Sequence, residues 1–487
     1  MAYARRSIAR PTSSCYIDAV ARTLIDKLWD EHLVADLGGG SSLLYIDRIF
    51  LHERTGSVAL KELTAAGRRV RNPEQVFCTM DHIVDTFPGR GDATRVPGGT
   101  EFITQTRAAA RAAGITLFDI GSDDQGIVHV VSPEQGIALP GVSLVCPDSH
   151  TCTLGGLGAL AWGIGSTEAE HALATKTLVV HKPRSMRIRF DGRLAPGVTA
   201  KDMILALIGA HTAAGGVGYA IEFAGEAVRS LPVEARLTLC NMGVEFGAWT
   251  VIIAADETTF EYVRGRPYAP RGEAWDKAIA HWRTLRSDDG ALFDKDLTLD
   301  CASLAPQVTW GTSPQHETGI DSVVPDPALQ ADANRRQSME RALEYMGLQP
   351  GTRLQGLPIQ GAFIGSCTNS RLSDLRAAAA ILEGRKVASG VRAICVPGST
   401  QVKRAAEHEG IDRVFREAGF EWRESGCSMC FYAGGESFGF EERVVSSTNR
   451  NFENRQGPRT RTHLASPATV AASAIAGHLA DVRPLMR

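Results

Sequence analysis

The amino-acid sequence predicts an α/β fold of several domains with mostly parallel sheets, and three observations predict it. Short apolar segments alternate with Ala-rich segments of helical periodicity along most of the chain, as in βα units. The chain has 487 residues, enough for about two to four domains. Its 44% hydrophobic and 22% charged residues are typical of a globular protein with several apolar cores.

The first predicted unit spans residues 1–186. Apolar periodicity predicts helices and buried strands in this order: a helix at 16–33, a strand at 42–50, a helix at 104–113, strands at 115–120 and 142–146, and a helix at 166–180. Residues 1–16 carry Arg5, Arg6 and Arg10 and no acidic residue. We therefore expect a solvated N-terminal extension there, with an organellar signal as the alternative.

Two further units follow. The second, 187–306, opens with an alternating strand at 186–190 and a helix from Ala200. The segment 306–332 is rich in Pro, Ser, Thr and Asp, which predicts a long loop. The third unit, 307–487, contains a predicted strand at 361–364 and helices at 373–383 and 469–479.

Charge and composition exclude some classes of protein. The net charge of −3 lacks the basic surplus of a nucleic-acid binder. No apolar run reaches the roughly 18 to 20 residues of a membrane helix, so we expect no membrane partner. Ten cysteines are too few for a disulfide scaffold, which predicts reduced thiols and a cytoplasmic location.

Three of the cysteines lie in segments typical of metal centres. Cys367 directly follows a predicted strand, and Cys427 and Cys430 form a Cys-x-x-Cys pair in a turn-rich segment. Such a pair brings two thiolates to one metal centre, although a redox dithiol or half of a zinc site has the same spacing. Three thiolates without an obvious fourth ligand suit an iron–sulfur cluster with one open iron, which can act as a Lewis acid.

Acid–base residues fall at or just after predicted strands. They are Asp81, His82, His129, Asp148 and His150. The carboxyl ends of strands are where open α/β sheets bind ligands, and a carboxylate beside a histidine favours the protonated ring of a general acid. The alternative is that each histidine only satisfies a buried hydrogen bond, which is less plausible for three together.

Two further features indicate anion binding and a buried carboxylate. Asn449, Arg450 and Arg455 place two guanidinium groups in one loop, suited to a di- or tricarboxylate, although a solvated basic turn has the same composition. Glu245 is a lone carboxylate in an apolar segment and needs a partner, for which one of the histidines could serve.

Together these motifs resemble the aconitase superfamily, and most closely the large subunits of its isopropylmalate dehydratase branch. The matching runs extend over almost the whole chain: 45–48, 125–129, 133–135, 148–150, 163–165, 256–259, 307–311, 365–370, 427–430 and 449–453. The resemblance implies three α/β domains around one [4Fe–4S] cluster held by Cys367, Cys427 and Cys430. It also implies dehydration and rehydration of a small 2-substituted malate in leucine biosynthesis.

The resemblance also implies roles for single residues. Asp81 and His82 should protonate the leaving hydroxyl, while His129 with Glu245 and Asp148 with His150 should order the water at the cluster. Ser149, Asn449, Arg450 and Arg455 should hold substrate carboxylates. The fourth, swivelling domain of single-chain aconitases has no counterpart before the chain ends. We therefore expect a separate small subunit as partner and little turnover by this chain alone.

Four departures from the family pattern affect which substrate we expect the pocket to bind. They are the run 56–58, Ile83, the run 431–436 that begins with Phe431, and Asn454. All lie near residues assigned to the pocket, so the substrate could be a related 2-substituted malate, as in a homoaconitase-like isomerase. A cluster-sensing RNA binder and an inactive scaffold are further alternatives, disfavoured by the acidic balance and by the complete set of catalytic residues.

Overall fold

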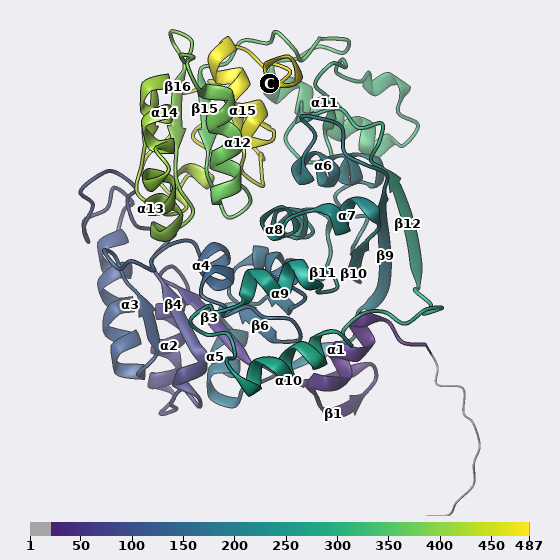
Figure 1. Ribbon diagram of the computed structural model, residues 1–487. Coiled ribbons are helices and arrows are strands. Elements are labelled where there is room, and N and C mark those ends of the chain that lie inside the picture. The colour runs from purple at the N-terminus through teal and green to yellow at the C-terminus, as the bar shows by residue number, and fades with distance from the viewer. Residues whose placement is uncertain (1–20, 487) are drawn as a thin grey trace, which may run out of the picture.

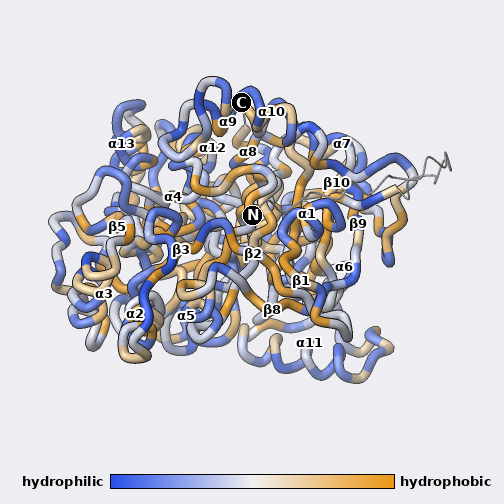
Figure 2. The backbone as a smooth tube through the Cα atoms, turned by 90° about the horizontal axis from the view of Figure 1, so that it is seen from below, coloured by the Kyte–Doolittle hydropathy of each residue, from blue (hydrophilic) through white to orange (hydrophobic). Residues whose placement is uncertain are grey.

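The computed structural model describes residues 21–486. The expected N-terminal extension lies outside the described residues. Within 21–486 no helix combines the length and apolarity needed to span a membrane. The chain forms three parallel sheets and two small antiparallel ones. In Figure 2 the outer helices α2 and α11 carry hydrophilic stretches, drawn in blue.

The first parallel sheet has five strands in the order β5-β4-β3-β6-β7. Its strands are β3 (Arg48–His52), β4 (Val76–Thr79), β5 (Thr116–Phe118), β6 (Ser143–Cys146) and β7 (Leu160–Gly163). The helices that accompany it along the chain are α1 (Leu24–His32), α2 (Gly56–Ala65), α3 (Gly99–Ala113), α4 (Val128–Glu134) and α5 (Ser166–Thr175), with short 3-10 helices η1 (Pro73–Gln75) and η2 (Ser149–Leu157). Two later helices, α9 (Glu257–Val263) and α10 (Glu273–Trp282), contribute Phe260, Trp275 and Trp282 to the same core.

Two segments of this unit were each predicted to be one element, and each contains two. The expected strand at 42–50 is two strands, β2 (Ser41–Tyr45) and β3, in different sheets. The break falls at Asp47, whose carboxylate bonds His32 at 2.8 Å and the Ser143 amide at 2.9 Å. The expected helix at 166–180 ends at Lys176 (φ 61°), and the β-branched residues beyond it form β8 (Thr177–His181). With β1 (Leu33–Gly38), β2 and β8 form an antiparallel sheet.

The second parallel sheet has the order β11-β10-β9-β12. Its elements are β9 (Arg184–Asp191), α6 (Ala200–His211), β10 (Tyr219–Ala224), α7 (Glu226–Ser230), α8 (Val233–Asn241), η3 (Val244–Phe246), β11 (Thr250–Ile252) and β12 (Lys295–Asp300). The predicted helix start at Ala200 is confirmed, and a capping box between Thr199 and Asp202 explains it. Apolar side chains of β9, β10, α6 and α8 form its core.

The third parallel sheet has the order β17-β16-β15-β18-β19. Its elements are α11 (Ala333–Met346), β15 (Gly361–Ile364), α12 (Leu372–Leu382), β16 (Arg392–Cys395), α13 (Thr400–His408), α14 (Ile411–Ala418), β17 (Phe420–Trp422), η5 (Ser428–Cys430), β18 (Arg443–Ser446), β19 (Arg461–Leu464), α15 (Pro467–Ala476) and η6 (Arg483–Leu485). The expected loop at 306–332 instead contains a small antiparallel pair, β13 (Gln307–Thr309) with β14 (Glu317–Gly319), and the short helix η4 (Pro327–Leu329). The domain boundaries near 186 and 306 stay a prediction.

The first and third sheets share one topological feature. In each, the strand order reverses between two neighbouring central strands, β3 and β6 in one and β15 and β18 in the other. Open α/β sheets bind ligands at the carboxyl ends of strands at such a switch point. Figure 1 shows the two sheets in separate parts of the molecule, one blue and one green to yellow, with α4 and α8 between them.

Candidate active site

Both switch points open into one cleft of about 360 Å³. From the first sheet it is lined by the last residue of β3 and by residues that follow β3, β4 and β6: His52, Arg54, Thr55, His82, Pro147, Asp148, Ser149 and His150. From the third sheet it is lined by residues that follow β15, β17 and β18: Cys367, Cys427, Cys430, Phe431, Asn449, Arg450 and Arg455. The cleft therefore joins residues more than 300 positions apart in the chain, because parallel strands gather their carboxyl ends at one edge.

His82 lies between two carboxylates in this cleft. Its Nδ1 is 2.6 Å from Asp81 Oδ1 and its Nε2 is 3.2 Å from Asp148 Oδ2. Burial disfavours the charged ring, yet Asp81, Cys427 and Asp148 together raise the pKa of His82 well above its ordinary value. Asp81 is fully buried, and its other carboxylate oxygen accepts from the Val128 amide at 3.1 Å. The two carboxylates thus favour the protonated form of the His82 imidazole and hold the ring in one orientation.

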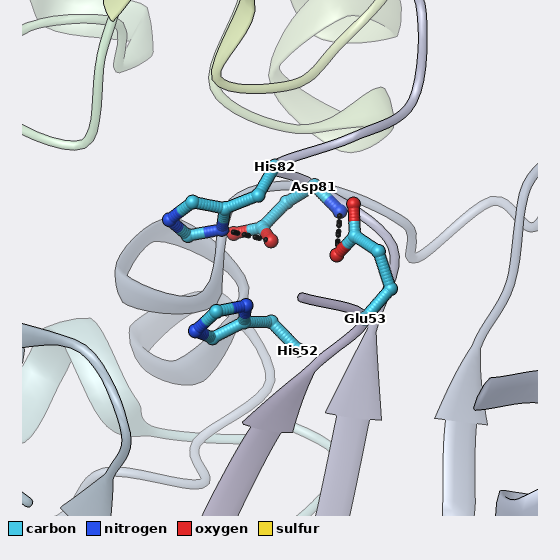
Figure 3. A group of neighbouring side chains, drawn as sticks. All are labelled: His52, Glu53, Asp81 and His82. Carbon is cyan, nitrogen blue, oxygen red and sulfur yellow. Dashed lines mark hydrogen bonds and ion pairs between the residues drawn. The ribbon is translucent and has the colours of Figure 1, made fainter. Parts of the chain in front are cut away.

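The residues that follow β3 support this pair and were missed by sequence reasoning. His52 stacks on His82 with ring centroids 4.1 Å apart, and burial lowers the pKa of His52 to about 4. The Glu53 carboxylate accepts from the backbone amide of Asp81 (Figure 3) and also from that of Ile83. Burial, with Asp81 nearby, raises the pKa of Glu53 to about 7. A His-Glu dipeptide at the end of a buried strand is the sequence signal that could have revealed them.

A second chain of polar contacts runs along the other side of the cleft. His150 Nε2 is 3.0 Å from Glu245 Oε1, and Arg450 Nε donates to the same oxygen at 2.6 Å. The Asp148 side chain caps η2 by accepting from the His150 amide at 2.7 Å. Burial opposes ionisation of Asp148, but His129, His150 and His82 hold its pKa well below the ordinary value. Burial likewise opposes ionisation of Glu245, but His150 and Arg450 lower its pKa.

His129 differs from its expected position. It lies in the first turn of α4 rather than at a strand end, and it does not line the cleft. Its Nε2 is 3.3 Å from Thr151 Oγ1, its Nδ1 has no partner within residues 21–486, and burial lowers its pKa to about 4. The expected pairing of His129 with Glu245 is wrong, because Glu245 bonds His150 and Arg450 instead.

The three predicted cysteines are buried side by side at the floor of the cleft. Cys367 Sγ lies 3.2 Å from Asn241 Nδ2 and 3.5 Å from Asn449 Nδ2, and Cys430 Sγ lies 3.2 Å from Ser366 Oγ. Burial raises the pKa of Cys367 to about 12 and that of Cys427 well above its ordinary value. Buried thiolates therefore need a cation to stabilise them, and the amide groups around them are suitable donors to ligated sulfur. This donor set fits an iron–sulfur cluster with three protein ligands.

Asn241 and Lys201 are the residues at the site that the sequence motifs indicate least. Asn241 ends α8 and donates to Cys367 and to Thr153 Oγ1. Lys201 is fully buried and donates to the Ser447 carbonyl at 2.9 Å, directly below the loop of Asn449. Burial lowers the pKa of Lys201 to about 7. Both residues come from the second sheet's helices, so the second unit braces the cysteine side of the cleft.

Ser149, Asn449, Arg450 and Arg455 all line the cleft. Ser149 Oγ is 3.4 Å from His150 Nδ1. Arg455 Nη2 lies 3.7 Å from Cys430 Sγ, while its buried Nε has no partner within residues 21–486. Of the predicted site residues, only His129 and Glu245 stand behind the lining, and Asp81 is enclosed beneath His82.

The chain is similar to known proteins in sequence and in fold. The crystal structure of Thermococcus kodakaraensis aconitase X (holo-form) covers 88% of this chain and 89% of its own, with a TM-score of 0.46 and 14% identity. The chain is 56% identical over 471 residues to 3-isopropylmalate dehydratase large subunit 1 of Bradyrhizobium diazoefficiens, covering 97% of this chain and 98% of that protein. Residues 26–477 match the model of the aconitase family (aconitate hydratase). With an α/β fold of parallel sheets and a match over nearly its whole length, the chain belongs to the aconitase family.

Proposed function

We propose that this chain is the large subunit of a 3-isopropylmalate dehydratase, a hydro-lyase that interconverts 2-isopropylmalate and 3-isopropylmalate in leucine biosynthesis. The observation that carries the proposal is one cleft in which three buried cysteines face a histidine held between two carboxylates. The 56% identity to a relative of that name supports the substrate.

Cys367, Cys427 and Cys430 would hold one [4Fe–4S] cluster. When bound, the cluster supplies a Lewis-acidic iron that polarises the substrate's hydroxyl and carboxylate. The free, buried state of every cysteine within residues 21–486 supports a reducing, cytoplasmic compartment.

His82 is the group that would protonate the leaving hydroxyl. Its raised pKa favours a proton on the ring, and Asp81 and Asp148 would fix the orientation of the ring in the cleft. In the reverse reaction, the same ring would accept a proton from the water molecule that adds to the substrate. Asp148 also bonds the backbone beside His150, so the donor and the water-ordering side of the cleft are rigidly connected.

The remaining residues would position substrate and water. His150, which bonds Glu245, would orient water, and His129 would support the Asp148 segment through its bond to Thr151, whose hydroxyl donates to the Asp148 carbonyl. Ser149, Asn449 and Arg450 would bind substrate carboxylates together with Arg455. Three domains with boundaries near 186 and 306, and a separate small subunit that completes the cleft, are part of the same proposal.

A related 2-substituted malate is the second candidate substrate. It is favoured by Phe431, which lies 5.8 Å from the His82 ring and gives this wall of the cleft an aromatic surface. Turnover of 3-isopropylmalate by the chain with its cognate small subunit decides between the two.

The cluster assignment is tested by replacing the three cysteines in turn. Anaerobically reconstituted Cys427→Ser protein should lose most of its iron and its iron–sulfur absorption, and so should Cys367→Ser and Cys430→Ser. Cys395→Ser is the matched control, since Cys395 is equally buried but lies in β16 away from the cleft. Zinc in place of iron, or an unchanged spectrum after all three substitutions, would overturn the proposal.

A further inference from the structure

The rim of the cleft carries an arginine that neither the catalytic chemistry nor the cysteines use. Arg54 lies in the turn after β3, two residues beyond His52, and its exposed side chain lines the cleft. Its guanidinium carbon is 5.0 Å from the centroid of the Phe431 ring. Within residues 21–486 the Arg54 side chain makes no ion pair and no hydrogen bond.

A second guanidinium group approaches the same ring from the third sheet. The Arg455 guanidinium carbon is 5.7 Å from the Phe431 centroid and 5.1 Å from that of Phe452. Its buried Nε has no hydrogen-bond acceptor within the described part of the chain. Two arginines from different sheets therefore converge on Phe431 without any carboxylate to neutralise them.

The third arginine of the cleft is different. Arg450 donates to Glu245 at 2.6 Å, so its charge is already compensated by a buried carboxylate. Two guanidinium groups near one ring repel each other, and cation–π contact with Phe431 offsets this by only about 1 kcal/mol at an exposed site. An anion between them would satisfy both, since a guanidinium fork matches a carboxylate in shape and charge.

We propose that Arg54 and Arg455 form a carboxylate-binding subsite at the rim of the cleft, with Phe431 as its floor. The subsite takes a carboxylate of the substrate, and its identity as that of a 2-substituted malate rests on the proposed function. The carboxylate belongs either to the malate core or to the substituent. Because Arg54 is carried by the first sheet and Arg455 by the third, the bound substrate links the two sheets directly.

The test uses the cluster-loaded chain with its cognate small subunit. We compare wild type, Arg54→Met and Arg54→Lys with two substrates: 3-isopropylmalate and 3-(carboxymethyl)malate, which carries a carboxylate on the substituent. Arg54→Met should raise KM by about 10- to 100-fold with a smaller change in kcat, the loss expected for one charge-assisted hydrogen bond. Arg54→Lys should recover part of the loss, because it restores charge without the planar fork.

The matched control is Arg264→Met. Arg264 also lies 5.0 Å from an aromatic centroid, that of Trp275, and is 57% exposed, but it does not line the cleft. Its substitution should leave KM unchanged. A larger KM for both substrates in Arg54→Met identifies a core carboxylate, and a larger KM for 3-(carboxymethyl)malate alone identifies a substituent carboxylate.

Failure of the subsite and failure of the proposed function give different results. If wild type turns over 3-isopropylmalate and Arg54→Met has unchanged KM for both substrates, the subsite is wrong and the function stands. If wild type does not turn over 3-isopropylmalate, the function is wrong. In that case, calorimetry on the cluster-loaded chain measures the Kd of the same two compounds. Equal Kd values for wild type and Arg54→Met overturn the proposed subsite.

Discussion

His82 is the residue that we propose as the general acid, because both of its ring nitrogens face carboxylates. His82→Asn removes the titrating group but keeps a side chain that can bond Asp81. We expect kcat to fall by about 10²- to 10⁴-fold, the usual contribution of a positioned general acid. Iron content and the cluster spectrum should stay at wild-type levels, which separates this loss from loss of the cofactor. A variant with wild-type kcat would assign the proton to another group.

Glu317 predicts a pH dependence of stability away from the cleft. It lies in β14, its Oε2 has no partner within the described residues, and burial raises its pKa from 4.5 to about 8. Between these values the folded protein holds a proton that the unfolded chain releases. The free energy of unfolding therefore falls as pH rises from about 5 to 8.

Glu317→Gln should remove this dependence. The variant should be more stable than wild type at pH 8 by roughly 1 to 3 kcal/mol, the cost of an unpaired buried group, and nearly equal to it at pH 5. Urea unfolding at both pH values measures the difference. Glu261→Gln is the control, because Glu261 is 74% exposed and should not change the pH slope. Parallel pH profiles for wild type and Glu317→Gln would contradict the assignment.

The sequence shows which residues act together only where those residues lie close together in the chain. Cys427 and Cys430 share one turn, and Asp81 and His82 are adjacent, so their partnership is visible in the sequence. Arg54 acts with Arg455 and Phe431, and Asn241 with Cys367; these contacts exist only once strands from separate sheets are brought together. His129 shows the converse, since its motif is clear but its ring bonds Thr151, while Glu245 bonds His150 and Arg450.

At the scale of elements, one of the contacts that join the first and third sheets is a close approach of two backbone segments. Residues 125–127, before α4, pair with residues 398–400, before α13: the Ile127 amide donates to the Gly398 carbonyl and the Thr400 amide to the Gln125 carbonyl, each at 2.8 Å. At Gly126 an added Cβ would lie 2.5 Å from Ser399 Cα. Only glycine permits this approach of the two backbones.

Gly126→Ala should force the two segments apart. We expect a loss of about 1 to 3 kcal/mol in stability from overpacking, measured by urea unfolding. Activity should fall as well, because the neighbouring Val128 amide holds Asp81. Gly91→Ala is the control, since a Cβ there meets no atom within 4 Å. Unchanged stability and kcat in Gly126→Ala would show that the segments can separate without cost.

Helices and strands were predicted well in segments that have a single apolar periodicity. They were predicted poorly in segments where one element follows another directly. The strand Gly361–Ile364 agrees with its predicted bounds because it is a short apolar run between turns. The runs 42–50 and 166–180 each join two elements without a glycine or proline, so apolar pattern alone could not divide them. The order of the strands within each sheet also cannot be predicted from the apolar pattern, and that order creates the two switch points.

At the scale of the whole molecule, the cleft is lined by an exposed Arg54 and a half-buried Phe431, and we expect a partner to complete it. The cluster-loaded chain alone should bind 3-isopropylmalate but turn it over at less than about 1% of the rate with its small subunit, since a positioned base contributes about 10²-fold or more. Steady-state kinetics with and without the subunit measure this. Full activity of the chain alone would refute the expected partner.

The contact at Gly126 and Ser399 also has a consequence for heat inactivation. The proton donor and the thiols are mounted on different sheets, each with its own apolar core. On warming, neither core has to melt for turnover to stop, because a slight parting of the two halves already removes the donor from reach. We therefore expect the temperature of inactivation to depend on the contacts between the two halves, such as those of Gly126 with Ser399 and of Asp81 with Cys427, as well as on the stability of each half.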